Sequence, residues 1–330
     1  MNADSNGRPR SSDRLRREIQ RRVQAMPADR QAVAQQNVRN AILSAFLGGI
    51  GVIKGGGAIS MAVPASRGRH SRDLDSSMRL DAEDFEEALR DRLEKGWQGF
   101  TGTLTPNPRR NRTRGTLMGM RPYKVALRYL GKPFCTIEFE AGPDHAGFNA
   151  NARPFTPDPE TTGLLSGLGF TLPPIESVDP RDQLADKLQA VSAPGAARGR
   201  DLADIATLVG RMGVIDLDDL RRRVRHVEGI EGSPACELEP GDYARLRESF
   251  DRGRPPPGYD ECWRAADSLL RQVDERHRSD WMGVFHASAL TIPDDIDADG
   301  GAGGRAAGTQ PRKPRGLPRG EAGTFDFKRR

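Results

Sequence analysis

The segment from Gly51 to Asp75 constrains the fold of this chain more than any other part of its sequence. It contains a short apolar stretch at 51–53, a glycine run at 55–57, a short helix-forming stretch, and two aspartates, Asp73 and Asp75. Glycines let the backbone approach a phosphate closely, and a helix N-terminus behind them offers free N–H donors. Residues two apart on a strand face the same side, so the aspartates form a pair that suits a divalent cation. The segment predicts a strand, a turn, a helix and a second strand around a nucleotide site.

Two common phosphate-binding motifs do not fit this glycine run. A Walker A loop ends in Gly-Lys-Ser/Thr, whereas Lys54 precedes the glycines here. A dinucleotide-binding G-x-G-x-x-G pattern that starts at Gly51 is also broken, with Lys54 three residues further on. Both readings are therefore rejected.

The rest of the N-terminal half alternates helices and strands. Apolar residues at helical spacing predict helices over 30–47 and 81–96, the second with Asp81 as its N-cap. Residues 97–140 predict strands, of which the last two form a hairpin around Gly131. This half therefore predicts a sheet with flanking helices.

The second half of the chain predicts helices. Prolines and glycines punctuate residues 141–180, which predicts mostly loop. Asp179-Pro180 makes a good helix start, because proline fits the first helical position. Helices are predicted from there to the loop at Pro194-Gly195 and over 201–212, 216–227, 241–252 and 259–276. The predicted fold class is α+β: a mixed sheet with flanking helices to about residue 140, then a helical half from about residue 180.

Basic residues concentrate in three places and give a net charge of +5. Arginines crowd residues 8–22, the segment Arg109–Arg114 and the end of the chain at 312–330. A polyanionic partner explains this pattern. Solubilising charge on disordered ends explains the two outer clusters equally well, whereas a partner is favoured for the middle one. Residues 11–24 predict a charged helix without a clear apolar stripe.

The composition predicts an ordered centre with disordered ends. Hydrophobic residues make up 36% of the chain and the mean hydropathy is −0.65, which is low for a wholly globular protein. We expect a basic flexible N-terminus at 1–29, an α/β domain at 30–145, a mainly helical domain at 146–290 that completes the site, and a disordered basic tail at 291–330.

Cysteine spacing and hydropathy indicate a cytoplasmic protein. Cys135, Cys236 and Cys262 lie far apart and lack the spacing of a zinc site or a disulfide framework. No apolar run approaches the roughly 18 residues that a membrane span needs, and the first residues lack the apolar core of a signal peptide. No membrane partner is expected.

An apolar strand, a Gly-Gly turn, a helix and then Asp-x-Asp on a strand resemble the nucleotidyltransferases of the DNA polymerase β superfamily. The resemblance implies a third carboxylate on a neighbouring strand. Glu138 is the candidate, between Ile137 and Phe139 on the last strand of the hairpin, and Glu140 on the same side stays an alternative. Three carboxylates would hold Mg²⁺ (or Mn²⁺), which binds the triphosphate and lowers the pKa of the attacking hydroxyl.

Four motifs in order resemble the AbiEii/AbiGii nucleotidyltransferase toxin family, over about residues 37–212. They are Lys54-Gly55-Gly56, Arg69-x-Ser71-x-Asp73-Leu74-Asp75, Lys187-Leu188-Gln189-Ala190 and Arg200-Asp201-Leu202-Ala203-Asp204-Ile205. One departure is Gly57, which stands where the family usually carries threonine, so a hydroxyl contact to phosphate is missing.

The resemblance implies an enzyme that moves NMP from an NTP to an RNA acceptor such as tRNA, as the toxin of a toxin–antitoxin or phage-defence pair with a winged-helix antitoxin. The implied metal ligands are Asp73 and Asp75 with Glu138, and Asp201 or Asp204 would orient Lys187 or assist the acceptor. The implied nucleotide-binding residues are Lys54, Gly55, Gly56, Ser71 and Lys187.

The residues alone leave other interpretations open. Asp201 and Asp204 share a helix face beside the apolar stripe, so Lys187 either bridges two helices or reaches the triphosphate. The resemblance favours the second. Gly57 and the basic ends also allow a non-catalytic nucleic-acid-binding protein on a degenerate nucleotidyltransferase scaffold. A third possibility is nucleotide transfer to a small molecule or a protein hydroxyl.

Overall fold

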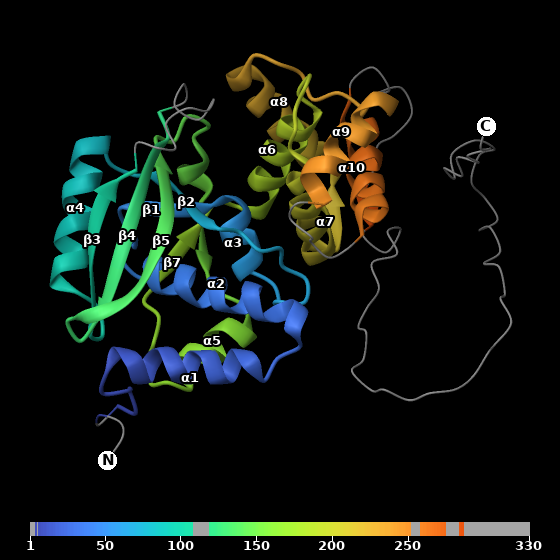
Figure 1. Cartoon of the computed structure of the whole chain (residues 1–330). Coiled ribbons are helices and arrows are strands. Elements are labelled where there is room, and N and C mark those ends of the chain that lie inside the picture. The colour runs from blue at the N-terminus through green and yellow to red at the C-terminus, as the bar shows by residue number, and fades with distance from the viewer. Residues whose placement is uncertain (1–3, 5, 108–118, 252–257, 275–283, 287–330) are drawn as a thin grey trace, which may run out of the picture. The chain divides into compact units, whose positions relative to one another are not determined.

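A seven-stranded mixed sheet organises the N-terminal part of the computed structural model (Figure 1). Its central strands run antiparallel between β1 and β2 and parallel between β2 and β5 and between β1 and β7. The spatial order is β3 (Phe100–Pro106), β4 (Arg121–Tyr129), β5 (Lys132–Gly142), β2 (Asp73–Met78), β1 (Gly51–Lys54), β7 (Ile175–Ser177) and β6 (Arg153–Phe155).

The structure describes residues 4, 6–107, 119–251, 258–274 and 284–286. The basic segment Arg109–Arg114, residues 108–118 of the predicted strand region and the basic tail at 291–330 lie outside the described residues. All the described residues belong to one compact unit, Met1–Ile292.

Helices flank the sheet and then follow it, which confirms the predicted α+β class. Around the sheet lie α1 (Ser12–Gln24), α2 (Ala28–Ser44), α3 (Gly55–Met61), α4 (Ala82–Lys95), α5 (Pro159–Ser166) and the short 3₁₀ helix Phe148–Asn151. The later part comprises α6 (Pro180–Ser192), α7 (Gly199–Met212), α8 (Leu217–Glu231), α9 (Pro240–Asp251) and α10 (Tyr259–Val273), with a small ribbon of β8 (Val214–Asp216) and β9 (Val284–His286). Figure 1 shows α6–α10 gathered into a bundle beside the sheet.

Each face of the sheet is covered by a different hydrophobic core. Ile53, Leu74 and Phe139 point into one core together with side chains of α1, α2, α4 and α5. Val52 of β1 and Ile59 of α3 belong to the second core, which α6–α10 supply. Because neighbours along a strand face opposite sides, Asp73 and Asp75 lie on the face that is turned toward the helical bundle.

The helix predicted at 11–24 forms, but the expectation that it lacks an apolar stripe is wrong. Leu15, Ile19 and Val23 are spaced four residues apart and are all buried in the first core. The Ser12 hydroxyl also donates a hydrogen bond to the Pro133 carbonyl at 2.6 Å. The prediction of a flexible N-terminus therefore does not hold for residues 12–24. One apolar residue in every four is enough to dock a helix, even in a strongly charged segment.

The segment at 141–180 is more ordered than predicted. It contains β6, α5 and β7, and β7 extends the sheet by pairing Ser177 with Ile53 of β1. Strands of three residues are too short to show a period-two pattern, so only the sheet edge that they meet makes them strands. Two local predictions are confirmed, since Asp81 caps α4 and Asp179 caps α6.

Candidate functional site

The glycine turn packs directly against the aspartate pair. β1 ends at Lys54, which is paired with Asp75 on β2. Gly55 then adopts φ +68°, and a Cβ atom there would overlap the Asp75 carboxylate, whose Cγ would lie 3.2 Å away. A side chain at position 55 would therefore suffer both backbone strain and a clash. Glycine at this position allows the Asp75 carboxylate to lie against the turn.

Position 57 carries glycine where the resembled family usually has threonine, and the packing around Gly57 explains this difference. A Cβ atom at this position would lie 2.7 Å from the Asp73 carbonyl oxygen and 3.2 Å from Nδ2 of Asn40. A threonine would need the backbone of the Asp73 strand to move, so position 57 contributes no hydroxyl to the site. The Nδ2 group of Asn40 is fully buried and has no hydrogen-bond partner among the described residues.

Four carboxylates lie on one face of the sheet. The parallel pairing of β2 with β5 sets Asp73 beside Glu138 and Asp75 beside Glu140. Paired residues on adjacent strands face the same side, so all four carboxylates point toward the helical bundle. The predicted pairing of the Glu138 strand with the Asp73 strand is confirmed. Because each aspartate has one glutamate beside it, the register does not identify which glutamate is the third carboxylate.

The Asp75 carboxyl lies in a strongly acidic and partly desolvated environment. Burial, with repulsion from Asp73 and Glu140, raises the pKa of Asp75 to about 7, against the attraction of Lys187 and Lys54. This cluster offers the hard oxygen donors that Mg²⁺ prefers, and a cation would relieve the repulsion. Within the described ranges, however, no three acidic, histidine or cysteine side chains are close enough to form a metal site as they stand. The donor chemistry fits a divalent cation, and the full ligand set is not formed.

Lys187 lies in a buried ion network that joins α6 and α7. Its Nζ atom lies 2.5 Å from Oδ1 of Asp201 and 3.1 Å from Oδ2 of Asp204. Burial lowers the pKa of Lys187, but the attraction of the two aspartates outweighs it, so the pKa stands above its ordinary value. The helix-bridging contact expected as one alternative is therefore present with both aspartates. Lys187 is also close enough to Asp75 to lower the pKa of that carboxyl.

Arg69 extends this network to the glycine turn. Its Nε and Nη2 atoms lie 2.7 and 2.8 Å from the two carboxylate oxygens of Asp204. Burial alone would raise the pKa of Asp204. The attraction of Arg69 and Lys187 outweighs this effect, so the pKa lies below its ordinary value and the carboxylate stays charged. On the other side, the Arg69 guanidinium lies against Gly56. The tertiary fold thus joins the glycine motif, the Asp-x-Asp motif and the two helical motifs into one site.

Ser71 lies beside the first aspartate of the pair, and its predicted contact to the triphosphate stays a prediction. Its hydroxyl is buried and donates a hydrogen bond to Oδ1 of Asp73 at 3.3 Å. It therefore orients a candidate metal ligand in this structure. The sequence interpretation assigned no role to Arg69, although this residue begins the quoted motif, two residues before Ser71. Its place in that motif was the available clue.

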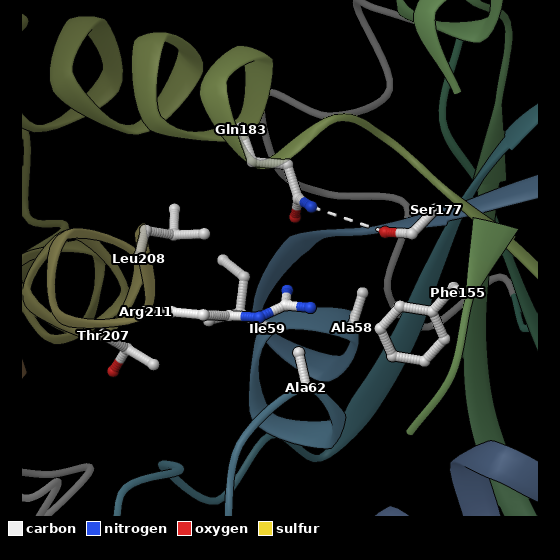
Figure 2. Close-up of a pocket in the computed structure, with 9 residues that line it drawn as sticks. All are labelled: Ala58, Ile59, Ala62, Phe155, Ser177, Gln183, Thr207, Leu208 and Arg211. Carbon is white, nitrogen blue, oxygen red and sulfur yellow. Dashed lines mark hydrogen bonds between the residues drawn. The ribbon is translucent and has the colours of Figure 1, made fainter. Parts of the chain in front are cut away.

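A small cavity beside the network is not the nucleotide site. It lies one helical turn along α6 and α7 from Lys187 and Asp204, and Figure 2 shows Arg211 extending into it. Its empty space, about 230 Å³ with its open mouth included, is below the roughly 300–1,000 Å³ of small-molecule pockets. Oε1 of Gln183 is buried there with no partner among the described residues. Ordered water suits such a lining.

Comparison with models of known protein families identifies the family of this chain. A sequence model of the family described as "Nucleotidyl transferase AbiEii toxin, Type IV TA system" matches residues 41–265. The chain therefore belongs to this family of nucleotidyltransferase toxins from type IV toxin–antitoxin systems. A search of curated proteins found no match.

In the part of the chain that the structure describes, no helix is long and apolar enough to cross a membrane.

Among solved structures, the chain is similar to MenT4, a nucleotidyltransferase toxin from Mycobacterium tuberculosis H37Rv. The two share 20% sequence identity with a TM-score of 0.45, and the match covers 80% of this chain and 95% of that one.

Proposed function

We propose that this site transfers NMP from an NTP to an RNA acceptor, with tRNA as the first candidate, in the presence of Mg²⁺ or Mn²⁺. The observation that carries the proposal is the meeting of two clusters at the glycine turn. The Asp75 carboxylate lies against Gly55, and Arg69, which is paired with Asp204 of the Lys187–Asp201–Asp204 network, lies against Gly56.

In the proposed reaction, an acceptor hydroxyl oxygen attacks the α-phosphorus of the NTP. A new P–O bond forms, the α–β phosphoanhydride bond breaks, and pyrophosphate leaves while the hydroxyl proton passes to solvent or a nearby base. Asp73 and Asp75, with Glu138 or Glu140, would hold divalent cations, which neutralise phosphate charge and lower the pKa of the hydroxyl. Gly55 and Gly56 would approach the phosphates through the backbone.

Lys187 can serve both as a helix bridge and as a phosphate ligand. An ammonium group carries three N–H donors, and two of them suffice for Asp201 and Asp204. The third stays available for a triphosphate oxygen. The two aspartates would then act as positioning residues that hold Lys187 in place. Lys54, which is paired with Asp75, supplies a second cation on the same face of the sheet.

The charge around the site supports a polyanionic acceptor. Burial lowers the pKa of His70, and the nearby Arg72, Arg39 and Arg69 lower it as well, so three arginines lie close to this residue just before Asp73. Arginine clusters bind phosphate groups without reading base sequence. We therefore favour RNA over a small-molecule acceptor. The proposal includes a cognate antitoxin, for which a winged-helix protein is the candidate.

The test is incubation of the full chain with each α-³²P-labelled NTP, Mg²⁺ and total RNA, followed by gel electrophoresis. We expect label on RNA with the wild type and loss of label with Asp73→Ala. Asp91→Ala, on the exposed side of α4, is the matched control and should retain activity. RNA binding without any NTP consumption in Mg²⁺ or Mn²⁺ would support the non-catalytic alternative. Label on protein or on a small molecule would identify a different acceptor.

A further inference from the structure

We propose that Arg69 is a phosphate-binding residue of this site and that it binds the pyrophosphate portion of the NTP, with Asp204 as its positioning residue. The inference rests on the proposed nucleotidyl transfer and names a ligand contact within it.

The first observation is how firmly Arg69 is oriented. Its guanidinium makes two parallel hydrogen bonds to Asp204, at 2.7 and 2.8 Å, and Asp204 is 1% exposed. A bidentate pair of this kind fixes the plane of the guanidinium as well as its position. Asp204 also accepts from Lys187 at 3.1 Å, so one buried carboxylate holds two cations. Both cations are thereby presented to the same region.

The second observation is where the guanidinium lies. A Cβ atom at Gly56 would overlap Nη2 of Arg69 and would lie 2.6 Å from Cζ and 3.2 Å from Nη1. At the preceding position, Gly55, a Cβ atom would overlap the Asp75 carboxylate. Consecutive Cα atoms are about 3.8 Å apart. The arginine and the candidate metal ligand therefore touch neighbouring residues of one turn, so phosphates bound through a cation at Asp75 would come within reach of Arg69.

The third observation concerns the donors that remain. Arginine has five N–H donors, of which the bidentate pair with Asp204 uses two. The other three, on Nη1 and Nη2, have no hydrogen bond to Asp204. A planar fork of donors matches the spacing of phosphate oxygens better than the point charge of a lysine does. These donors suit an oxyanion, and the diphosphate group of the proposed NTP substrate is the oxyanion that this site would bring to them.

A purely structural role is the competing explanation, because Arg69 also ties α7 to the glycine turn. The two roles differ in ligand binding. Arg69→Lys keeps the charge and the contact with Asp204 but loses the fork. We expect inorganic pyrophosphate, titrated calorimetrically in Mg²⁺ and again in EDTA, to bind the variant about tenfold more weakly. Binding is measured well below the melting temperature of the variant, because the loss of one of the two contacts with Asp204 also lowers stability.

Two further variants keep the test decisive. Arg198→Lys is the matched control, since Arg198 contacts Asp201 at 3.5 Å in the same network but is 57% exposed. It should bind pyrophosphate as the wild type does. Gly56→Ala should weaken pyrophosphate binding because its methyl group displaces the guanidinium, and adding Arg69→Lys to it should then cost little more, whereas an independent effect of Gly56 on the phosphates would add to that of Arg69→Lys. This variant replaces Arg69→Lys if that protein does not fold.

The outcomes separate this inference from the proposed function. Unchanged pyrophosphate affinity in Arg69→Lys and Gly56→Ala, in a protein whose wild type labels RNA, overturns the role of Arg69. Loss of pyrophosphate binding only together with a lowered melting temperature and full recovery at low temperature would show a structural role instead. Arg69-dependent pyrophosphate binding in a wild type that transfers no nucleotide would refute nucleotidyl transfer and leave the binding site standing.

Discussion

Replacing Asp204 by alanine should destabilise the protein strongly. The Asp204 carboxylate is 1% exposed and accepts from Arg69 and Lys187, whose side chains are each 10% exposed. The variant leaves Arg69 without its bidentate partner and Lys187 with Asp201 alone. Breaking a buried ion pair by removing one partner costs about 3–5 kcal/mol, because the remaining charge is desolvated without compensation.

The magnitude can be compared with two related variants. Asp201→Ala should cost less, because Lys187 keeps Asp204 and because Arg198, the other partner of Asp201, is 57% exposed. Asp91→Ala removes an exposed carboxylate on α4 and should change the free energy of unfolding by less than about 0.5 kcal/mol. The free energy of unfolding should therefore fall most in Asp204→Ala, less in Asp201→Ala and least in Asp91→Ala.

Urea unfolding followed by circular dichroism measures these costs. With an m-value near 3 kcal/mol/M, as for a larger chain, Asp204→Ala should lower the midpoint by about 1–2 M. A loss below about 1 kcal/mol at an unchanged m-value would refute the reasoning, since the network would then be solvated in solution. A larger loss for Asp201→Ala than for Asp204→Ala would equally contradict it.

Three further predictions follow from the structure. Leu15→Ala should lower the free energy of unfolding by about 2–5 kcal/mol in the same urea assay, because a fully buried side chain of α1 is removed from the core; an unchanged midpoint would mean that α1 does not dock. Burial alone would raise the pKa of Asp179, but hydrogen bonds from Arg181 and Arg153 outweigh it and hold the pKa well below its ordinary value. Its stabilising effect is therefore fully present above the unfolded value of about 3.9 and shrinks as the pH falls from there through the folded value. Asp179→Asn should destabilise the protein in urea unfolding at pH 7, and its difference from the wild type should shrink steadily as the pH is lowered below about 4. Mg²⁺ should raise the melting temperature of the wild type in thermal scans, because it relieves the repulsion around Asp75, and should have a smaller effect on Asp75→Asn; equal shifts would place the ion elsewhere.

Much of the fold could be predicted from the sequence because its signals are local. Asp81 and Asp179 cap their helices as predicted, since a cap depends on the two or three residues that follow it. The hairpin around Gly131 forms because its turn and its alternating strands adjoin in sequence. The Asp-x-Asp pair faces one way for the same local reason. These features determine the α+β class and the glycine–aspartate half of the site.

Only the tertiary structure decided how distant segments meet. The parallel register sets Glu138 beside Asp73 and Glu140 beside Asp75, and no local pattern specifies such a register. The fold also brings Arg69 against Gly56 and onto Asp204, a residue 135 positions further along the chain. Buried charges find their partners through packing, and packing joins segments that are remote in sequence. The sequence by itself thus determined which residue types form the site, and the tertiary structure determined which of them touch.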